Sequence, residues 1–205
     1  MKKYLFLFIL LTLFIVPINV YAKKTKVKLS KCIDGDTISV IIDKEERKVR
    51  FLAVDAPEID LNEPYSNEAK EFTCNLLKDS KNIYLEYDKN SDKEDKYERI
   101  LAWVWADDTL VQKELVKDGY ARIAYLYGEY KYTSELNKYE SLAKEYKLNI
   151  WSDKIIEKED HKPEIKEKKK KIDTYLDRIN KSYEILVIII AGILALITLY
   201  LKRKK

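Results

Sequence analysis

The sequence is poor in histidine, cysteine, glycine and methionine, and the first two shortages restrict the possible chemistry. Its 205 residues include one histidine, two cysteines, four glycines and one methionine. The histidine, His161, lies in a run of charged residues and is a poor candidate for catalysis, so any mechanism must work without histidine. The cysteines, Cys32 and Cys74, can form one disulfide in an oxidising exterior or remain two separate buried thiols.

The chain also lacks the charge excess that would attract a polyanion over a distance. Its formal net charge is +4, but six of the basic residues lie at the two ends, in positions 2–3 and 202–205. Residues 23–201 carry 33 basic and 35 acidic side chains, and residues 23–152 carry 23 basic and 26 acidic ones. Any contact with a polyanion must therefore come from a local basic patch or a bound cation.

What the chain does have is an apolar segment at each end. At the N-terminus, Lys2 and Lys3 precede a long apolar run that ends in small residues at Ala22, which is the order of a secretory signal. We therefore expect residues 1–22 to be a signal peptide that is cleaved after Ala22. An uncleaved anchor is the alternative, and it leads to the same export.

The second apolar segment runs from Ile185 to Leu201, seventeen residues without a charge, and a basic tail at 202–205 follows it. We expect residues 184–201 to be a transmembrane helix, because a buried core helix, the alternative, seldom lacks polar residues on every face. The basic tail favours a cytoplasmic C-terminus, so the domain would be extracytoplasmic in a single-pass protein of the cell membrane. Four lysines close behind the first segment argue against this topology: Lys23, Lys24, Lys26 and Lys28.

Short runs with β-type alternation dominate residues 26–105, namely "VKLSKCI", "TISVII", "RKVRFLAV", "NIYLEYD" and "ILAWVWA". A helix is predicted over residues 66–77 with Ser66 as its N-cap, and two more are predicted in residues 110–120, ending at Gly119, and 134–147. Strands early in the chain and helices late predict an α+β domain over residues 23–153, a small β-barrel with helices packed on it. Residues 154–183 are almost wholly charged and are predicted to be a linker or a solvated helix.

Two short motifs supply carboxylates of the kind that hard cations such as Ca²⁺ require. "DGDT" offers Asp34 and Asp36, and "VDAPEID" offers Asp55, Glu58 and Asp60. Taken alone, an Asp-Gly turn is more often only a turn. The neighbouring cations strengthen the case for a binding site.

Basic residues lie next to both acidic motifs. Arg50 precedes Asp55 by five residues, and "DKYERILAWVW" places Lys96, Tyr97 and Arg99 immediately before another predicted strand. Carboxylates that hold a cation, together with two arginines that grip an anion, make a site suited to a phosphate ester.

The motifs "IDGDT", "RFLAVDAPE", "DKYERILAWVWADD", "GYARIAYLY" and "LNIWSD" resemble those of the staphylococcal nuclease (thermonuclease) family, in order and at compatible spacing. The resemblance covers about residues 26–153. It implies a five-stranded OB-type β-barrel with three helices, and Ca²⁺-dependent cleavage of DNA and RNA to 3′-phosphate products.

The resemblance also implies a metal site and a phosphate site. Asp36, Asp55 and the backbone carbonyl of Ala56 would hold Ca²⁺, and Asp34 would be a turn residue. Arg50 and Arg99 would neutralise the charge that develops on the phosphoryl oxygens. Two further sets of residues match the family's pattern: Glu58, which would accept the proton of the attacking water or orient that water, and the nucleotide-pocket positions Lys96, Tyr97, Tyr125 and Tyr127. Packing within the barrel is the alternative for Tyr125 and Tyr127.

The sequence departs from the family at two positions near this site. Ala56 stands where the staphylococcal enzyme has threonine, which matters little if only the carbonyl binds metal. Glu98 replaces the glycine before Arg99, and we expect it to disfavour a positive φ angle and so to alter the pocket. The loop after Glu58 is acidic, which predicts weak, metal-dependent binding to long nucleic acid.

The leading hypothesis is therefore a membrane-tethered, Ca²⁺-dependent nuclease with DNA and RNA as substrates and no obligate protein partner. The alternative is a non-catalytic, membrane-tethered OB module that binds nucleic acid, in which the polar set would be eroded. A membrane-bound scaffold would leave that set without purpose. Catalysis is favoured because the whole set is present: Asp36, Arg50, Asp55, Glu58 and Arg99.

Overall fold

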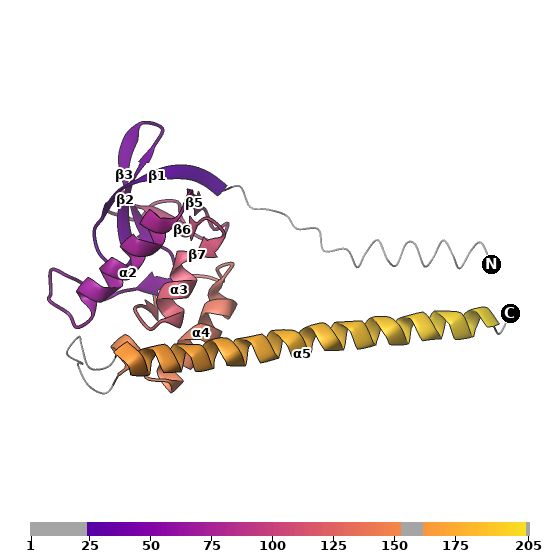
Figure 1. Cartoon of the computed structure of the whole chain (residues 1–205). Coiled ribbons are helices and arrows are strands. Elements are labelled where there is room, and N and C mark those ends of the chain that lie inside the picture. Colours follow the sequence, from indigo (N-terminus) through magenta and orange to yellow (C-terminus); the bar gives the residue numbers. More distant parts are fainter. Residues whose placement is uncertain (1–23, 153–161, 204–205) are drawn as a thin grey trace.

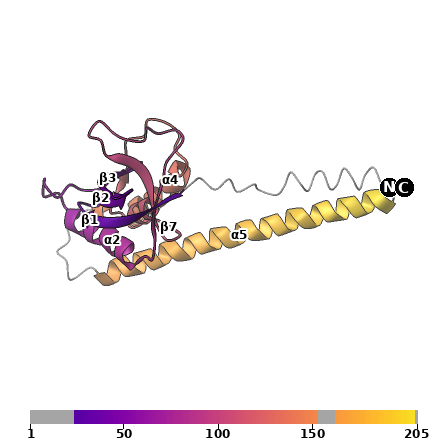
Figure 2. The same cartoon turned by 90° about the horizontal axis from the view of Figure 1, so that it is seen from above.

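The computed structural model of the chain describes residues 24–152 and 162–203 (Figure 1). The predicted signal peptide, the first part of the charged segment with His161, and the last two residues lie outside the described residues. The described residues form a barrel domain and one long helix that runs away from it (Figures 1 and 2).

Five strands close into the predicted barrel. They are β1 (Lys24–Cys32), β2 (Thr37–Ile42), β3 (Glu45–Phe51), β5 (Ile83–Glu86) and β6 (Ile100–Ala106), and each overlaps one of the five alternating runs. Neighbours pair in an antiparallel way in the order β3-β2-β1-β5-β6, and a parallel pairing of β3 with β6 closes the barrel. The predicted α+β barrel fold is confirmed.

Period-two alternation sorts the β6 side chains between two sides of the barrel wall. Ile100, Ala102 and Val104 share one side, and they and Trp103 are all buried in the main core. Trp103 and Trp105 lie together on the other side, because both rings contact the ring of Tyr132, at centroid distances of 5.1 and 5.7 Å. Period-two alternation along the run "ILAWVWA" accounts for this shared side.

Three helices pack on the barrel, as predicted: α2 (Ser66–Asp79), α3 (Val111–Lys117) and α4 (Thr133–Glu145). The prediction that Ser66 caps α2 is wrong. Tyr65 occupies the cap position in a left-handed conformation, with φ of 68°, and Ser66 is already helical and buried. The predicted stop at Gly119 is confirmed. Gly119 has φ of 70°, and a Cβ there would lie 2.6 Å from the carbonyl oxygen of Leu148.

Cys32 and Cys74 form a disulfide, which decides between the two possibilities that the sequence left open. The bond joins the last residue of β1 to α2 across 42 residues of chain. It therefore fastens α2 to the barrel next to the "DGDT" turn that follows Cys32.

Two short strands and a 3₁₀ turn complete the domain. The strand β4 (Val54–Asp55) pairs with β8 (Arg122–Ile123), with Asp55 opposite Arg122. The strand β7 (Thr109–Leu110) extends the sheet beside β6, and the 3₁₀ turn is η1 (Asn149–Trp151). The β4–β8 pair brings the "VDAPE" and "GYARIAYLY" motifs together.

The helix α5 (Lys162–Arg203) continues without a break from the charged segment into the apolar one. Its first part packs on the domain, where Ile172 is buried against Ala143 and Leu148. The rest extends clear of the domain in both views (Figures 1 and 2). Its most apolar window is long enough to cross a membrane and is not buried, so α5 is a candidate membrane span. A buried core helix, the alternative from the sequence, does not fit this exposure.

Candidate active site

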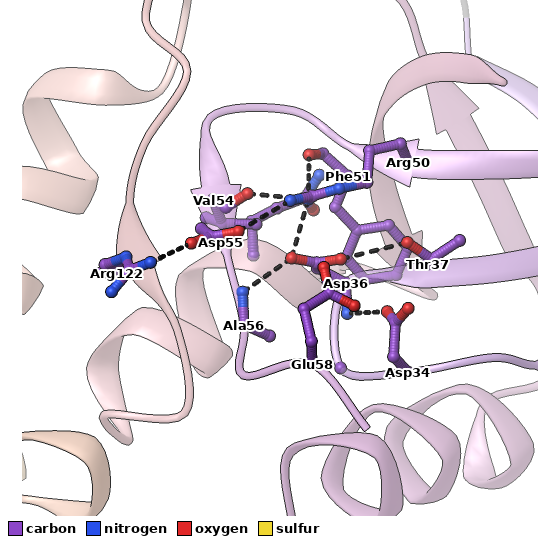
Figure 3. A network of polar contacts seen from close by, with 12 residues as sticks. Asp34, Asp36, Thr37, Arg50, Phe51, Val54, Asp55, Ala56, Glu58 and Arg122 are labelled. Atoms are coloured by element: carbon purple, nitrogen blue, oxygen red, sulfur yellow. Dashed lines mark hydrogen bonds and ion pairs between the residues drawn. The ribbon is translucent and has the colours of Figure 1, made fainter. Parts of the chain in front are cut away.

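The guanidinium of Arg50 is the centre of a buried polar cluster on the barrel (Figure 3). Its Nη1 lies 2.8 Å from Oδ2 of Asp36, and its Nη2 lies 3.1 Å from Oδ1 of Asp55. Nη1 also donates to the carbonyls of Val54, at 2.8 Å, and Phe51, at 3.3 Å. Both carboxylates that the sequence assigned to a metal site therefore contact one guanidinium, which the backbone holds in place.

The backbone of the "DGDT" turn lies next to this cluster. Asp34 Oδ1 accepts a hydrogen bond from the backbone N–H of Asp36 at 3.0 Å, so Asp34 is a turn residue in the structure. A Cβ on Gly35 would lie 2.6 Å from Cβ of Ala56 and 2.8 Å from Cβ of Ala69. Gly35 is thus required because α2 and the Ala56 turn approach the backbone closely at this point.

Asp36 is almost completely buried, and both of its carboxyl oxygens accept hydrogen bonds. Oδ2 accepts from the backbone N–H of Ala56 at 2.7 Å, and Oδ1 accepts from the hydroxyl of Thr37 at 3.1 Å. Burial raises the pKa of Asp36 to about 8, although the Arg50 guanidinium and the Ala56 N–H both favour the charged form. A negative charge at Asp36 is therefore unfavourable even beside Arg50, and a second cation would stabilise it.

The donor atoms of this cluster fit a hard divalent cation. The carboxylates of Asp36 and Asp55 and a backbone carbonyl are oxygen ligands, which suit Ca²⁺ or Mg²⁺ better than softer metals. A divalent cation would also offset the cost of ionising the buried Asp36. Within residues 24–152 and 162–203 no group of three or more His, Cys, Asp or Glu side chains is placed to hold a metal ion. The predicted set does not need one, because it consists of two carboxylates and a carbonyl.

Glu58 adds a solvent-accessible carboxyl to the buried cluster. Its carboxyl end points toward Asp36 (Figure 3). Partial burial, followed by the charge of Asp34, raises the pKa of Glu58, while Arg50 acts in the opposite direction. A carboxylate that is more basic than usual and open to water can accept a proton, which is what a general base requires.

Arg99 belongs to the loop that precedes β6. Its Nε donates to Oδ2 of Asp95 at 2.7 Å, so Asp95 holds it rather than Asp36 or Asp55. The parallel register pairs Arg50 with Leu101, and Arg99 lies two residues before Leu101. Arg99 therefore lies immediately before the strand that pairs with the Arg50 strand.

Glu98 adopts a positive φ of 62°, so the expectation that a glutamate here would keep the loop out of this conformation is wrong. The backbone N–H groups on both sides explain why. Those of Tyr97 and Arg99 both donate to Oδ1 of Asp95, at 2.9 and 3.0 Å, and they hold the turn against the strain of a left-handed glutamate. The loop therefore keeps a glycine-like conformation without glycine.

Exposed aromatic rings lie beside both arginines. Tyr97, Tyr125 and Tyr127 are all exposed, which does not fit packing within the barrel for the last two. The guanidinium carbon of Arg50 lies 5.5 Å from the ring centroid of Tyr125, and Lys96 Nζ lies 4.9 Å from that of Tyr97. The structure thus brings Tyr125 to the Arg50 cluster and Lys96 and Tyr97 to the Arg99 loop.

Arg122 is a site residue that the sequence analysis did not identify. Its Nη2 lies 2.6 Å from Oδ2 of Asp55, so Asp55 lies between Arg50 and Arg122 (Figure 3). The sequence contains little indication of this contact, because Arg122 is 67 residues from Asp55 and only the pairing of β4 with β8 brings them together. The "GYARIAYLY" motif around it was the available hint.

The closed barrel with a carboxylate–arginine cluster on its wall defines the class as an OB-type barrel protein with a polar site. A family model described as "Staphylococcal nuclease homologue" matches residues 48–153. The chain belongs to the staphylococcal nuclease family, as the resemblance of its motifs predicted.

Individual relatives agree with this assignment. Endonuclease YncB of Bacillus subtilis (strain 168) is 42% identical over 135 residues, which are 63% of this chain and 63% of the relative. The SPbeta prophage-derived endonuclease YokF of the same organism is 40% identical over 131 residues, 62% of this chain and 44% of the relative. The thermonuclease of Staphylococcus hyicus is 37% identical over 135 residues, 64% of this chain and 78% of the relative. The chain thus spans less than two thirds of the length of the two Bacillus relatives.

Proposed function

We propose that this protein is a Ca²⁺-dependent nuclease that hydrolyses phosphodiester bonds of DNA and RNA and leaves 3′-phosphate products. The observation that carries the proposal is the cluster in which Asp36 and Asp55 share the Arg50 guanidinium. It occurs in a family with relatives named endonuclease and thermonuclease. An OB barrel that only bound nucleic acid would gain nothing from burying two carboxylates at this cost.

In this proposal Asp36, Asp55 and the carbonyl of Ala56 hold the cation. When bound, Ca²⁺ supplies positive charge to the phosphoryl oxygens as they become more negative. The burial of Asp36 supports this role, because its raised pKa makes a nearby divalent charge favourable.

Arg50 and Arg99 donate hydrogen bonds to the phosphate. Arg50 is preorganised by the carbonyls of Val54 and Phe51, so little reorganisation is needed as the reaction proceeds. Removing one such donor typically costs about 3–4 kcal/mol of transition-state stabilisation. Glu58 then accepts the proton of the attacking water or orients that water.

The exposed rings and Lys96 bind the nucleotide. Tyr125 and Tyr127 lie on the segment after β8, where an open ring can stack on a base or hydrogen-bond to the sugar–phosphate backbone. Beside Arg99, the ring of Tyr97 can stack on a base and Lys96 can hydrogen-bond to the sugar–phosphate backbone. This arrangement is tolerant of base identity, because every base has a face on which to stack.

We also propose that the domain, residues 23–153, works outside the cell, after export by residues 1–22 and anchorage by residues 184–201. The apolar part of α5 supports the anchor, and Tyr183 and Tyr200 lie near its two ends, where aromatic side chains favour the membrane interface. Residues 154–183 connect the domain to the anchor, and residues 202–205 form the cytoplasmic tail.

The test is cleavage of DNA and RNA by the full chain in detergent, with Ca²⁺ or with EGTA. We expect cleavage with Ca²⁺ only, a loss of about 10²–10³-fold in Arg99→Ala, and an equal or larger loss in Arg50→Ala. Lys138→Ala, at an exposed position of α4, is the matched control and should cleave normally. Cleavage that survives EGTA contradicts the proposed metal dependence. Binding without cleavage points instead to the non-catalytic OB module.

A further inference from the structure

Asp55 joins two arginines whose surroundings differ. Oδ1 faces Arg50 at 3.1 Å, and Oδ2 faces Arg122 at 2.6 Å. The Arg50 side chain is 9% exposed, whereas that of Arg122 is 61% exposed. A guanidinium has five N–H groups, so Arg122 can bind Asp55 and still present donors to a ligand in solvent.

Arg122 and Asp55 also line a pocket of about 290 Å³. Ala56, Tyr65 and Ser152 lie on its wall, and the hydroxyls of Tyr65 and Ser152 are 2.8 Å apart. Glu63 is the second acid of the pocket, and its Oε2 accepts the backbone N–H of Glu58 at 2.8 Å. The pocket thus has an arginine and two hydroxyls beside the candidate active site.

We propose that Arg122 and this pocket bind a second phosphate of the nucleic-acid strand, next to the phosphate that is cleaved. Arg50 and Arg122 are separated by a single carboxylate, so a strand whose scissile phosphate faces Arg50 can place a neighbouring phosphate at Arg122. Arginine is suited to this role, because its planar fork matches two phosphate oxygens. The proposal rests on the nuclease function above and specifies its substrate as a chain with at least two phosphates.

The experiment compares two substrates in the full chain with Ca²⁺: a dinucleoside monophosphate, which has one phosphodiester, and a single-stranded 20-mer. We expect Arg122→Ala to lower kcat/KM for the 20-mer about tenfold or more beyond any loss on the one-phosphate substrate, with the extra loss mainly in KM. Arg122→Lys should restore part of the loss. The salt dependence of KM for the 20-mer should weaken by about 0.7 in log–log slope, as expected for one lost phosphate contact.

Each outcome separates the possible roles. An equal loss on both substrates would mean that Arg122 only positions Asp55, and this result overturns the second-phosphate site. An unchanged KM for the 20-mer overturns it as well. If the unsubstituted chain cleaves neither substrate, the proposed nuclease function fails instead. Lys138→Ala serves again as the control for an unrelated surface cation.

A different observation concerns how the domain meets its candidate membrane helix. Ile172 of α5 is 1% exposed and packs against Ala143 and Leu148 of the domain. Lys117 Nζ lies 2.6 Å from Oδ1 of Asp173, and Lys169 pairs with the largely buried Asp118. The first turns of α5 are therefore part of the domain's packing.

The helix continues from this interface into the apolar segment. Leu176 is the last residue of α5 that packs in the cluster around Ile172, and Ile185 is nine residues further along. At 1.5 Å per residue this is about 14 Å of continuous helix. We infer that residues 165–176 fasten the domain to the membrane helix, so that it stays at a fixed orientation beside the bilayer instead of swinging on a flexible tether.

Spin-label distances in lipid nanodiscs test this inference, with labels at the exposed positions Lys138 and Lys181. We expect one narrow distance distribution in the full chain and in Ile179→Asn, and a broad one in Ile172→Asn. Ile179 is the matched control, because it follows Ile172 by one heptad and is 44% exposed. Asp173→Lys, which opposes Lys117, should broaden the distribution without placing a polar group in the core. A broad distribution in the unsubstituted chain, or a narrow one in both Ile172→Asn and Asp173→Lys, overturns the inference.

Discussion

The polar cluster and the loop before β6 each contain an Asp–Arg pair of the same chemistry in different surroundings. Arg50 Nη1 lies 2.8 Å from Asp36, and Arg99 Nε lies 2.7 Å from Asp95. The side chains of the first pair are 9% and 2% exposed, and those of the second are 29% and 17% exposed. The distances are nearly equal, so the difference between the pairs comes from their burial.

The balance between burial and hydrogen bonding decides the direction in which the pKa of each carboxyl shifts. Desolvation raises the pKa of Asp36 to about 8 and outweighs the charge of Arg50. Burial acts in the same direction on Asp95, but the backbone N–H and guanidinium of Arg99 and the N–H of Tyr97 outweigh it, so the pKa of Asp95 is lowered. The buried pair thus holds charge at a cost, which suits a site awaiting a cation and a phosphate, whereas the outer pair organises its loop.

The largest expected effect follows from removing the cation of the buried pair. Arg50→Ala should lower the free energy of unfolding by about 3–5 kcal/mol, because it leaves Asp36 and Asp55 buried without their guanidinium. Urea unfolding followed by tryptophan fluorescence measures this change. Arg47→Ala is the control, because Arg47 lies on the same strand and pairs with exposed Glu94, and its loss should cost about 1 kcal/mol or less. Equal losses in the two variants would remove the distinction between buried and outer pairs.

Arg99→Ala should lower the catalytic rate strongly and the free energy of unfolding only slightly. We expect its catalytic rate to fall about 10²–10³-fold, as for loss of one transition-state donor. Its free energy of unfolding should change by about 1 kcal/mol or less, because the pair is partly exposed. Measuring kcat and urea unfolding for the same variant tests both expectations. A stability loss as large as that of Arg50→Ala would show that the loop supports the fold and not only the site.

The pH dependence of stability sharpens the comparison at Asp95. Its folded pKa is depressed, so its stabilisation is present above the ordinary value of 3.8 and is lost as pH falls through the lower, folded value. Asp95→Asn should therefore reduce the free energy of unfolding at pH 7 by about 1–2 kcal/mol and flatten its decline below pH 4. Asp92→Asn, an exposed neighbour, should leave both features unchanged. An unaltered acid limb in Asp95→Asn would mean that another group controls it.

The smallest expected effect concerns the strained residue of the same loop. Glu98→Gly should raise the free energy of unfolding by about 0.5–1 kcal/mol, because glycine adopts a positive φ without steric cost. Lys147→Gly, at another positive φ far along the chain, should give a similar gain and no change in activity. Thermal unfolding of both variants measures the gains. A loss of stability in Glu98→Gly alone would assign the side chain of Glu98 a stabilising contact.

Local pattern was sufficient to predict the elements of the fold, but it failed at two backbone turns and where distant segments meet. The alternating runs predicted every barrel strand, and Gly119 predicted the end of α3, because both signals depend on nearby residues. The Ser66 cap was wrong because the preceding Tyr65 takes the left-handed conformation that begins α2. Glu98 was misjudged because Asp95 supports its turn, and Arg122 was missed because only the β4–β8 pairing joins it to Asp55.

The sequence by itself determined the strands, the helices, the apolar segments and the family, because periodicity and motif spacing are local properties of the chain. Only the tertiary structure decided that Asp36 and Arg50 are buried together, that Cys32 meets Cys74, and that Asp55 lies between two arginines. It likewise decided that Ile172 packs on the domain while Ile179 does not. Desolvation and charge pairing depend on which distant groups share a site, and the closure of the barrel determines that.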